Sequence, residues 1–188
     1  MQVSVKHIGL VVSIFAVLTS FLFFGRQQET YQLMLLVGLL TSGVCFLWIL
    51  FASGTAKSKF LWTGIVALGV LLNWLTESYF INSSYRIYLY QFSKELATTN
   101  DILKNKSGEV WIMNDSLSVK GGPELTQTEK QRLLQEKEKL GTYMILKTDS
   151  TIYYGLWGFL DVRLGLTYSI SGVQPKAQTR HLTGNWFY

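Results

Sequence analysis

The sequence predicts a membrane protein with three N-terminal transmembrane α-helices, the third extending into a stalk, followed by a small, mostly antiparallel α+β domain. Three observations support this fold class. Nearly all of the long apolar runs lie before residue 77, as expected of membrane spans. An aromatic and polar stretch, 72–92, follows the last run. The remainder combines β-forming segments with one well-capped helix. We therefore divide the chain into a transmembrane domain, 1–78, and an outer domain, 79–188.

Three segments have the length and composition of membrane spans, about 8–25, 31–53 and 60–78. The first two contain no charged residue, and the third contains none before Glu77. A helix needs about 20 apolar residues, with about 17 as the lower limit, to cross the hydrocarbon core. The first run lacks the small-residue cleavage pattern of a signal peptide, so we expect it to remain as a helix. The single cysteine, Cys45, lies in the second run and is interpreted as an apolar packing residue.

Lysine and arginine in the short connecting loops indicate the orientation of the spans. Lys6 precedes the first span, and Lys57 and Lys59 precede the third. The loop between the first two spans carries only Arg26, partly offset by Glu29. We expect the N-terminus to be cytoplasmic in a bacterial inner (plasma) membrane. The outer domain would then be periplasmic or extracellular.

Two pairs of small residues in the spans are candidates for close helix packing. Gly38 and Ser42 lie four residues apart in the second span, and Thr63 and Ala67 do so in the third. Small side chains at this spacing allow two helix backbones to approach each other. Such pairs are common in transmembrane helices, so they indicate packing and not a partner. Independently of them, the expected partners are the lipid bilayer and either further copies of the chain or a membrane partner subunit.

The third span is predicted to continue outside the membrane as a helical stalk to about residue 98. Ile81, Tyr85, Tyr88, Phe92 and Leu96 recur at helical spacing and form one apolar stripe. The segment 82–84, Asn-Ser-Ser, is the expected weak point, where a kink or a short loop could intervene. Two interpretations of the stripe remain open. It could pack on the sheet of its own domain, or it could pair with copies of itself in an oligomer.

The rest of the outer domain predicts the element order β-β-α-β-β-β-β. Residues 108–123 indicate two strands across a turn at Asn114-Asp115. Residues 125–141 indicate a helix, with a capping box of Thr126 and Glu129 and with Gly141 at its C-terminal end. Residues 142–172 predict two or three strands, and 180–188 predict a last one. This element order after a stalk helix resembles the extracytoplasmic PAS-like sensor domains of bacterial receptors, and the resemblance implies a sensory role.

The residues that most resemble a site lie near the C-terminus. Asp161 and Arg163, two apart in a predicted strand, share one face and interrupt an apolar run. Such charges need a partner, which a structural ion pair would supply. A recognition patch is the alternative, in which Arg163 binds an anionic group and Trp157 or Trp186 stacks on the ligand, with His181 nearby.

The sequence contains no strong catalytic, cofactor or metal motif. It has two histidines, His7 and His181, no phosphate-binding glycine loop and no carboxylates at metal-ligand spacing. We therefore expect no enzyme activity, no cofactor and no metal. The net charge of +5 does not indicate nucleic-acid binding, because basic residues of the outer part alternate with acids.

Three functional hypotheses follow. The first is a non-enzymatic inner-membrane protein that displays an extracytoplasmic domain for a ligand or partner, as a sensor or as a subunit of an envelope complex. The second is a membrane-disrupting effector of a bacterial defence or toxin system, which ion leakage on induction would reveal. The third is an accessory of an envelope enzyme, in which Asp161 and His181 would be essential. The identity of the ligand or partner is not encoded in any motif.

Overall fold

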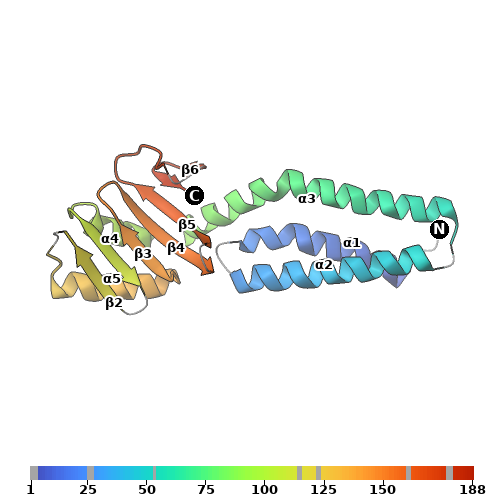
Figure 1. Ribbon diagram of the computed structural model, residues 1–188, viewed down its shortest axis with the longest axis horizontal. Coiled ribbons are helices and arrows are strands. Elements are labelled where there is room, and N and C mark those ends of the chain that lie inside the picture. Colours follow the sequence, from blue (N-terminus) through green and yellow to red (C-terminus); the bar gives the residue numbers. More distant parts are fainter. Residues whose placement is uncertain are drawn as a thin grey trace. The chain divides into compact units, whose positions relative to one another are not determined.

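The structure of the protein is a computed structural model that describes residues 4–24, 28–52, 54–113, 116–121, 124–159, 162–176 and 180–188. The chain divides into two compact units, Met1–Ser84 and Tyr85–Tyr188. The first contains long apolar helices, and the second contains an antiparallel sheet with helices on one of its faces (Figure 1).

The first unit contains α1 (Val5–Ser20), a short 3-10 turn (Phe21–Phe23), α2 (Gln28–Phe51) and the apolar part of α3 (Ala56–Gln91). Among the residues that the structure describes, three helical segments are long and apolar enough to cross a membrane, Val5–Phe23, Glu29–Phe51 and Ala56–Gln91. The prediction of three long apolar helices near the N-terminus is therefore confirmed. Most apolar side chains of α2 are exposed, among them Leu40 at 62% and Val44 at 64%. Such a surface is expected of a helix that faces lipid.

The third helix, α3, ends at Gln91, so it is shorter than the continuous stalk predicted to about residue 98. It runs without interruption through 82–84, so the predicted weak point there is wrong. Ser83 donates a hydrogen bond from Oγ to the carbonyl of Tyr79, and Ser84 donates one to the carbonyl of Phe24. Because these hydroxyls are satisfied, the serines do not compete for the helix backbone. The break comes at Phe92, whose φ of −109° and ψ of 24° are not helical, and α4 (Ser93–Leu103) follows directly.

The second unit is built on a seven-stranded antiparallel sheet. Its strands are β1 (Glu109–Met113), β2 (Ser116–Lys120), β3 (Met144–Lys147), β4 (Thr151–Phe159), β5 (Val162–Ser169), β6 (His181–Thr183) and β7 (Trp186–Phe187). The order across the sheet is β2-β1-β3-β4-β5-β7-β6. The small antiparallel α+β domain is thus confirmed. One detail is corrected: the predicted last strand is two short strands, separated at Gly184, whose φ of 51° is left-handed.

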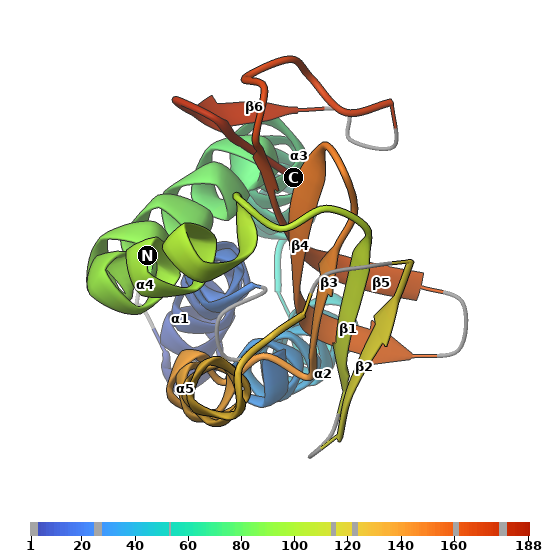
Figure 2. The same ribbon diagram turned by 90° about the vertical axis from the view of Figure 1, so that its left-hand side faces the viewer.

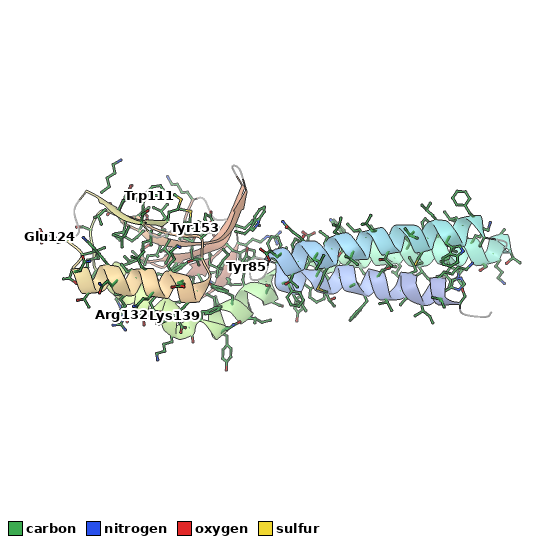
Figure 3. All side chains as sticks on the ribbon, turned by 90° about the horizontal axis from the view of Figure 1, so that it is seen from below. Tyr85, Trp111, Glu124, Arg132, Lys139 and Tyr153 are labelled. Carbon is green, nitrogen blue, oxygen red and sulfur yellow. The ribbon has the colours of Figure 1, made fainter. Side chains whose placement is uncertain are left out.

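The helix α5 (Gln127–Leu140) lies between β2 and β3 in the chain and begins and ends as predicted. Its N-cap is Thr126, and the reciprocal hydrogen bonds with Glu129 complete the capping box. It ends at Gly141, which is left-handed with φ of 63°. Figure 2 shows α4 and α5 on the same side of the sheet. Figure 3 shows Arg132 and Lys139 along α5, on the side away from the sheet.

The core of the second unit lies between the sheet and its helices. One row of paired residues runs across the helix-facing side, through Val110, Lys147, Ile152, Tyr168 and Trp186. The aromatic stripe covers part of this side. Its members Tyr85, Tyr88 and Leu96 are each only 2% exposed, and the Tyr88 hydroxyl donates to the carbonyl of Leu140 at 2.8 Å. These stripe residues therefore pack within their own unit, in agreement with the first of the two interpretations.

On the opposite side of the sheet, tyrosine rings lie directly over glycine residues of β4 and β5. A Cβ at Gly155 would lie 2.6 Å from the ring of Tyr143, and one at Gly165 would lie 3.0 Å from the ring of Tyr153. Glycine is therefore needed at these positions, because any side chain would displace a ring. Trp111 and Tyr153, which are labelled in Figure 3, are both in register with Leu146 and therefore lie on this same face.

Candidate ligand-binding groove

The residues predicted as a site are not gathered at one place. Asp161 lies outside the described residues, and Arg163 lies in β5, where its backbone is paired with Gly158. Trp157 is paired with Leu164 in β5, whereas Trp186 is paired with Tyr168. Leu164 and Tyr168 are four residues apart in one strand, which corresponds to about 13 Å. The two tryptophans therefore lie at different levels of the sheet.

His181 and Trp186 also face different surroundings. The imidazole of His181 packs against the ring of Phe187 with centroids 5.1 Å apart, and its Nε2 lies 2.9 Å from the carbonyl oxygen of Gly184. The Trp186 indole instead packs against Tyr168, at 5.2 Å, and Tyr154, at 5.6 Å. Among the predicted residues whose side chains the structure describes, Trp186 lines a groove.

This groove lies between α4 and the end of the sheet formed by β5 and β7, and we call it the α4 groove. It encloses about 310 Å³, near the lower end of the range of small-molecule pockets. It combines a wall of two aromatic rings with apolar side chains, a buried amide and a charged rim. Its lining consists of Leu89, Ser93, Leu96, Ala97, Asn100, Asp101, Lys104, Tyr168 and Trp186.

The sequence builds both walls by ordinary periodicity. Ser93, Ala97, Asn100 and Lys104 are spaced by four, three and four residues, which places them on one face of α4. Tyr168 is paired with Trp186 across β5 and β7, and paired residues project from the same face of a sheet. Because Ala97 is small, the helix face and the two rings leave space between them.

Asn100 is the most buried polar residue of the groove, at 8% exposure. Its Oδ1 accepts a hydrogen bond from the hydroxyl of Tyr154 at 2.8 Å. Burial raises the pKa of Tyr154 well above its ordinary value of 10.0, so this hydroxyl remains a donor at physiological pH. With Oδ1 fixed in this way, the planar amide places its NH2 group on the opposite side. Asn100 can therefore offer two N–H donors to a bound molecule.

Asp101 and Lys104 form an ion pair at the rim of the groove, with Oδ1 and Nζ 2.5 Å apart. The hydrogen bond to Asp101 raises the pKa of Lys104 above its ordinary value, so the ammonium stays charged. Their side chains are 67% and 43% exposed. Exposed pairs of this kind contribute little to stability. A ligand can therefore separate the two groups at small cost and use both charges.

Lys147 is a second unusual group, and it is structural. It is fully buried in β3, where its ammonium donates to the carbonyls of Lys106 and Gly108. Burial lowers its pKa, with an opposing effect from Asp149. These hydrogen bonds fasten the connection between α4 and β1 onto the sheet. Because Lys147 is inaccessible, it cannot contact a ligand in this conformation.

The packing residues predicted in the spans differ in their surroundings. A Cβ at Gly38 would lie 2.7 Å from Val17 of α1, and Ser42 donates a hydrogen bond to Ser13 at 2.8 Å. Gly38 and Ser42 therefore lie where α2 meets α1. Thr63 and Ala67, in contrast, are exposed on α3.

The close approach of α3 to α1 occurs at Gly69, whose added Cβ would lie 2.9 Å from Ile14. Gly69 lies two positions beyond the predicted pair. Because no small residue lies four positions from it in the apolar part of α3, the spacing pattern used for the prediction could not identify it.

Sequence reasoning did not identify most of the α4 groove. It found Trp186 but missed Asn100, Asp101, Lys104 and Tyr168. The available signal was the small and polar face of α4, most of which lies beyond residue 98, where the predicted stalk ended. Among the described residues, no group of three or more His, Cys, Asp or Glu side chains could hold a metal ion.

Comparison with known proteins does not assign this chain to a family. A scan against protein-family models found no match, and searches of curated proteins and of solved structures also found none. Any functional argument must therefore come from the groove and from the helices themselves.

Proposed function

We propose that the protein is a non-enzymatic integral protein of the bacterial inner membrane whose C-terminal unit binds a small molecule in the α4 groove. It would act as a sensor or as the ligand-responsive subunit of a membrane complex. The observation that carries the proposal is the α4 groove itself. It brings two aromatic rings together with the buried amide of Asn100, whose Oδ1 is occupied by Tyr154, and a few polar groups beside apolar and aromatic side chains are characteristic of ligand sites.

The distribution of charge supports an extracytoplasmic location for this unit. Lys6, Lys57 and Lys59 flank the ends of the spans that would face the cytoplasm, against Arg26 at the other side. With three spans, the C-terminal unit would lie in the periplasm or outside the cell. An alkaline phosphatase fused after Tyr188 should then be active. A fusion that is active only with a cytoplasmic reporter would contradict this orientation.

The continuity of the helices provides a route by which binding could be communicated. The groove-lining helix α4 begins directly after Phe92, where α3 ends, and α3 contains a candidate membrane span. A ligand that favours one position of α4 would bias the bend at Phe92. Small shifts of packed helices are an established way of transmitting such a change.

A substitution that fills the groove tests the proposal. Ala97→Phe places a ring in the space between α4 and Trp186, whereas Gln131→Phe places the same ring on the exposed side of α5. The full-length protein in detergent would be screened by thermal shift against amino acids, nucleosides, sugars and carboxylic acids. We expect compounds that stabilise the wild type and Gln131→Phe but not Ala97→Phe. Equal stabilisation of Ala97→Phe would exclude the α4 groove as the binding site.

A further inference from the structure

We propose that the α4 groove binds a zwitterionic small molecule with an aromatic or large apolar group, the chemical class of the free aromatic α-amino acids. This inference rests on the proposed ligand-binding function and adds the identity of the ligand class. It follows from three groups of the α4 groove, which are the ion pair at its rim, the amide at its base and the two rings of its wall.

The ion pair selects for a ligand that carries both charges. Asp101 and Lys104 lie side by side at the rim and together have no net charge. A simple anion would be attracted by Lys104 but repelled by Asp101. A simple cation would be attracted by Asp101 but repelled by Lys104. A zwitterion can place its ammonium against Asp101 and its carboxylate against Lys104, so both contacts become charge-assisted hydrogen bonds.

The amide of Asn100 adds a second contact for the carboxylate. Asn100 lines the α4 groove, and because its Oδ1 accepts a hydrogen bond from Tyr154, its NH2 group is the part of the amide that can donate to a ligand. Asn100 and Lys104 are four residues apart on α4 and are therefore neighbours on the same face. Donors at these two positions can bind the two oxygens of one carboxylate, which a neutral hydroxyl or an amine would not satisfy.

The wall of the α4 groove favours an aromatic side chain. The rings of Tyr168 and Trp186 meet at 61° with centroids 5.2 Å apart, and Leu89 and Leu96 add apolar surface. A third ring can stack on one of these faces or meet its edge. The volume of about 310 Å³ suits one ring and its amino-acid backbone. It does not suit a large ligand such as a dinucleotide.

Four related probes separate these contributions. L-phenylalanine has the ring and both charges, phenethylamine lacks the carboxylate, 3-phenylpropionate lacks the amine, and L-alanine lacks the ring. Binding to the full-length protein in detergent would be measured by isothermal titration calorimetry. We expect L-phenylalanine to bind at least about tenfold more tightly than each of the other three, because each lacks one charge-assisted or aromatic contact.

Charge-removing variants provide a readout that a purely structural role would not give. Asp101→Asn should weaken the binding of L-phenylalanine about fivefold to tenfold and leave the binding of 3-phenylpropionate unchanged or stronger. Lys104→Gln should weaken the binding of L-phenylalanine to a similar extent and leave the binding of phenethylamine unchanged or stronger. Both side chains are exposed, so folding should be preserved. Glu138→Gln, exposed on α5, is the matched control and should bind like the wild type.

The failure of this inference can be distinguished from the failure of the proposed function. Equal affinities for the four probes, or no binding of any of them, would overturn the proposed ligand class. If other compounds then stabilise the wild type but not Ala97→Phe, the α4 groove remains the site and only its ligand class is wrong. If nothing distinguishes Ala97→Phe from the wild type, the proposed function fails as well.

Discussion

Two tyrosine-to-phenylalanine substitutions remove the same atom and should have opposite effects. The hydroxyl of Tyr154 is fully buried and donates to Asn100 at 2.8 Å. The hydroxyl of Tyr143 is also buried, but it has no hydrogen-bond partner among the residues that the structure describes. The comparison therefore isolates the contribution of one hydrogen bond, since the lost volume is the same in both variants.

The magnitudes follow from what each variant leaves behind. Tyr154→Phe removes the hydrogen bond and leaves Oδ1 of Asn100 buried without a donor, which should cost about 1–3 kcal/mol. Tyr143→Phe removes an unsatisfied polar group, so it should be neutral or stabilising by about 1 kcal/mol. The free energy of opening the sheet should differ between the two variants by about 3 kcal/mol, which corresponds to roughly 100-fold in the opening equilibrium.

Hydrogen exchange measured by mass spectrometry is a suitable assay, because it reports opening of the sheet without requiring the apolar helices to unfold. Peptides from β4 should exchange faster in Tyr154→Phe and at the wild-type rate or more slowly in Tyr143→Phe. Equal changes in the two variants would refute the reasoning. Tyr154→Phe should also weaken L-phenylalanine binding, because it releases the amide of Asn100.

Three further predictions concern the second unit. Gly165→Ala should destabilise it by more than about 3 kcal/mol, because the new Cβ would lie 2.1 Å from the carbonyl oxygen of Tyr154; a cost under about 1 kcal/mol in urea unfolding would contradict this. The folded state lowers the pKa of Lys147, so the unfolded chain binds more protons and the free energy of unfolding should rise with pH toward 10.5, the ordinary lysine value. Lys147→Met should flatten this slope, and an unchanged slope would exclude Lys147 as its origin. Hydrogen bonding to Lys106 lowers the pKa of Glu129. The contribution of Glu129 to the free energy of unfolding is therefore complete above pH 4.5 and is lost as pH falls through the lowered pKa. Glu129→Gln should reduce the acid sensitivity seen in pH-dependent melting, whereas a variant as acid-sensitive as the wild type would contradict the assignment.

The elements that the sequence predicted well are those specified by local patterns. The apolar runs specify three long helices, because 20 residues without charge leave few alternatives. The helix α5 could be bounded at both ends, since Thr126, Glu129 and Gly141 are sufficient to form its caps. The predicted break at 82–84 failed because a local preference was judged without the carbonyls that accept hydrogen bonds from Ser83 and Ser84.

The candidate site was harder to predict because its residues meet only through strand order. In the chain, Tyr168 and Trp186 are separated by a turn and by β6. The sheet places β7 between β5 and β6, and this position brings the two rings together. Asp161 and Arg163 were predicted as site residues because they are charged residues within an apolar run. Asp101 and Lys104 were not predicted, because they lie beyond the expected end of the stalk near residue 98 and do not interrupt an apolar run.

By itself, the sequence determined the number of apolar helices, the boundaries of α5 and the antiparallel character of the second unit. Each of these depends on neighbours within a few residues, through hydrogen bonding, capping and hydrophobic periodicity. Only the tertiary structure decided that α4 lies beside β5 and β7, that Asn100 is held by Tyr154, and that a space remains between helix and sheet. Those features depend on how strands distant in the chain pair and on which side chains are too small to fill the gap, and no local pattern contains that information.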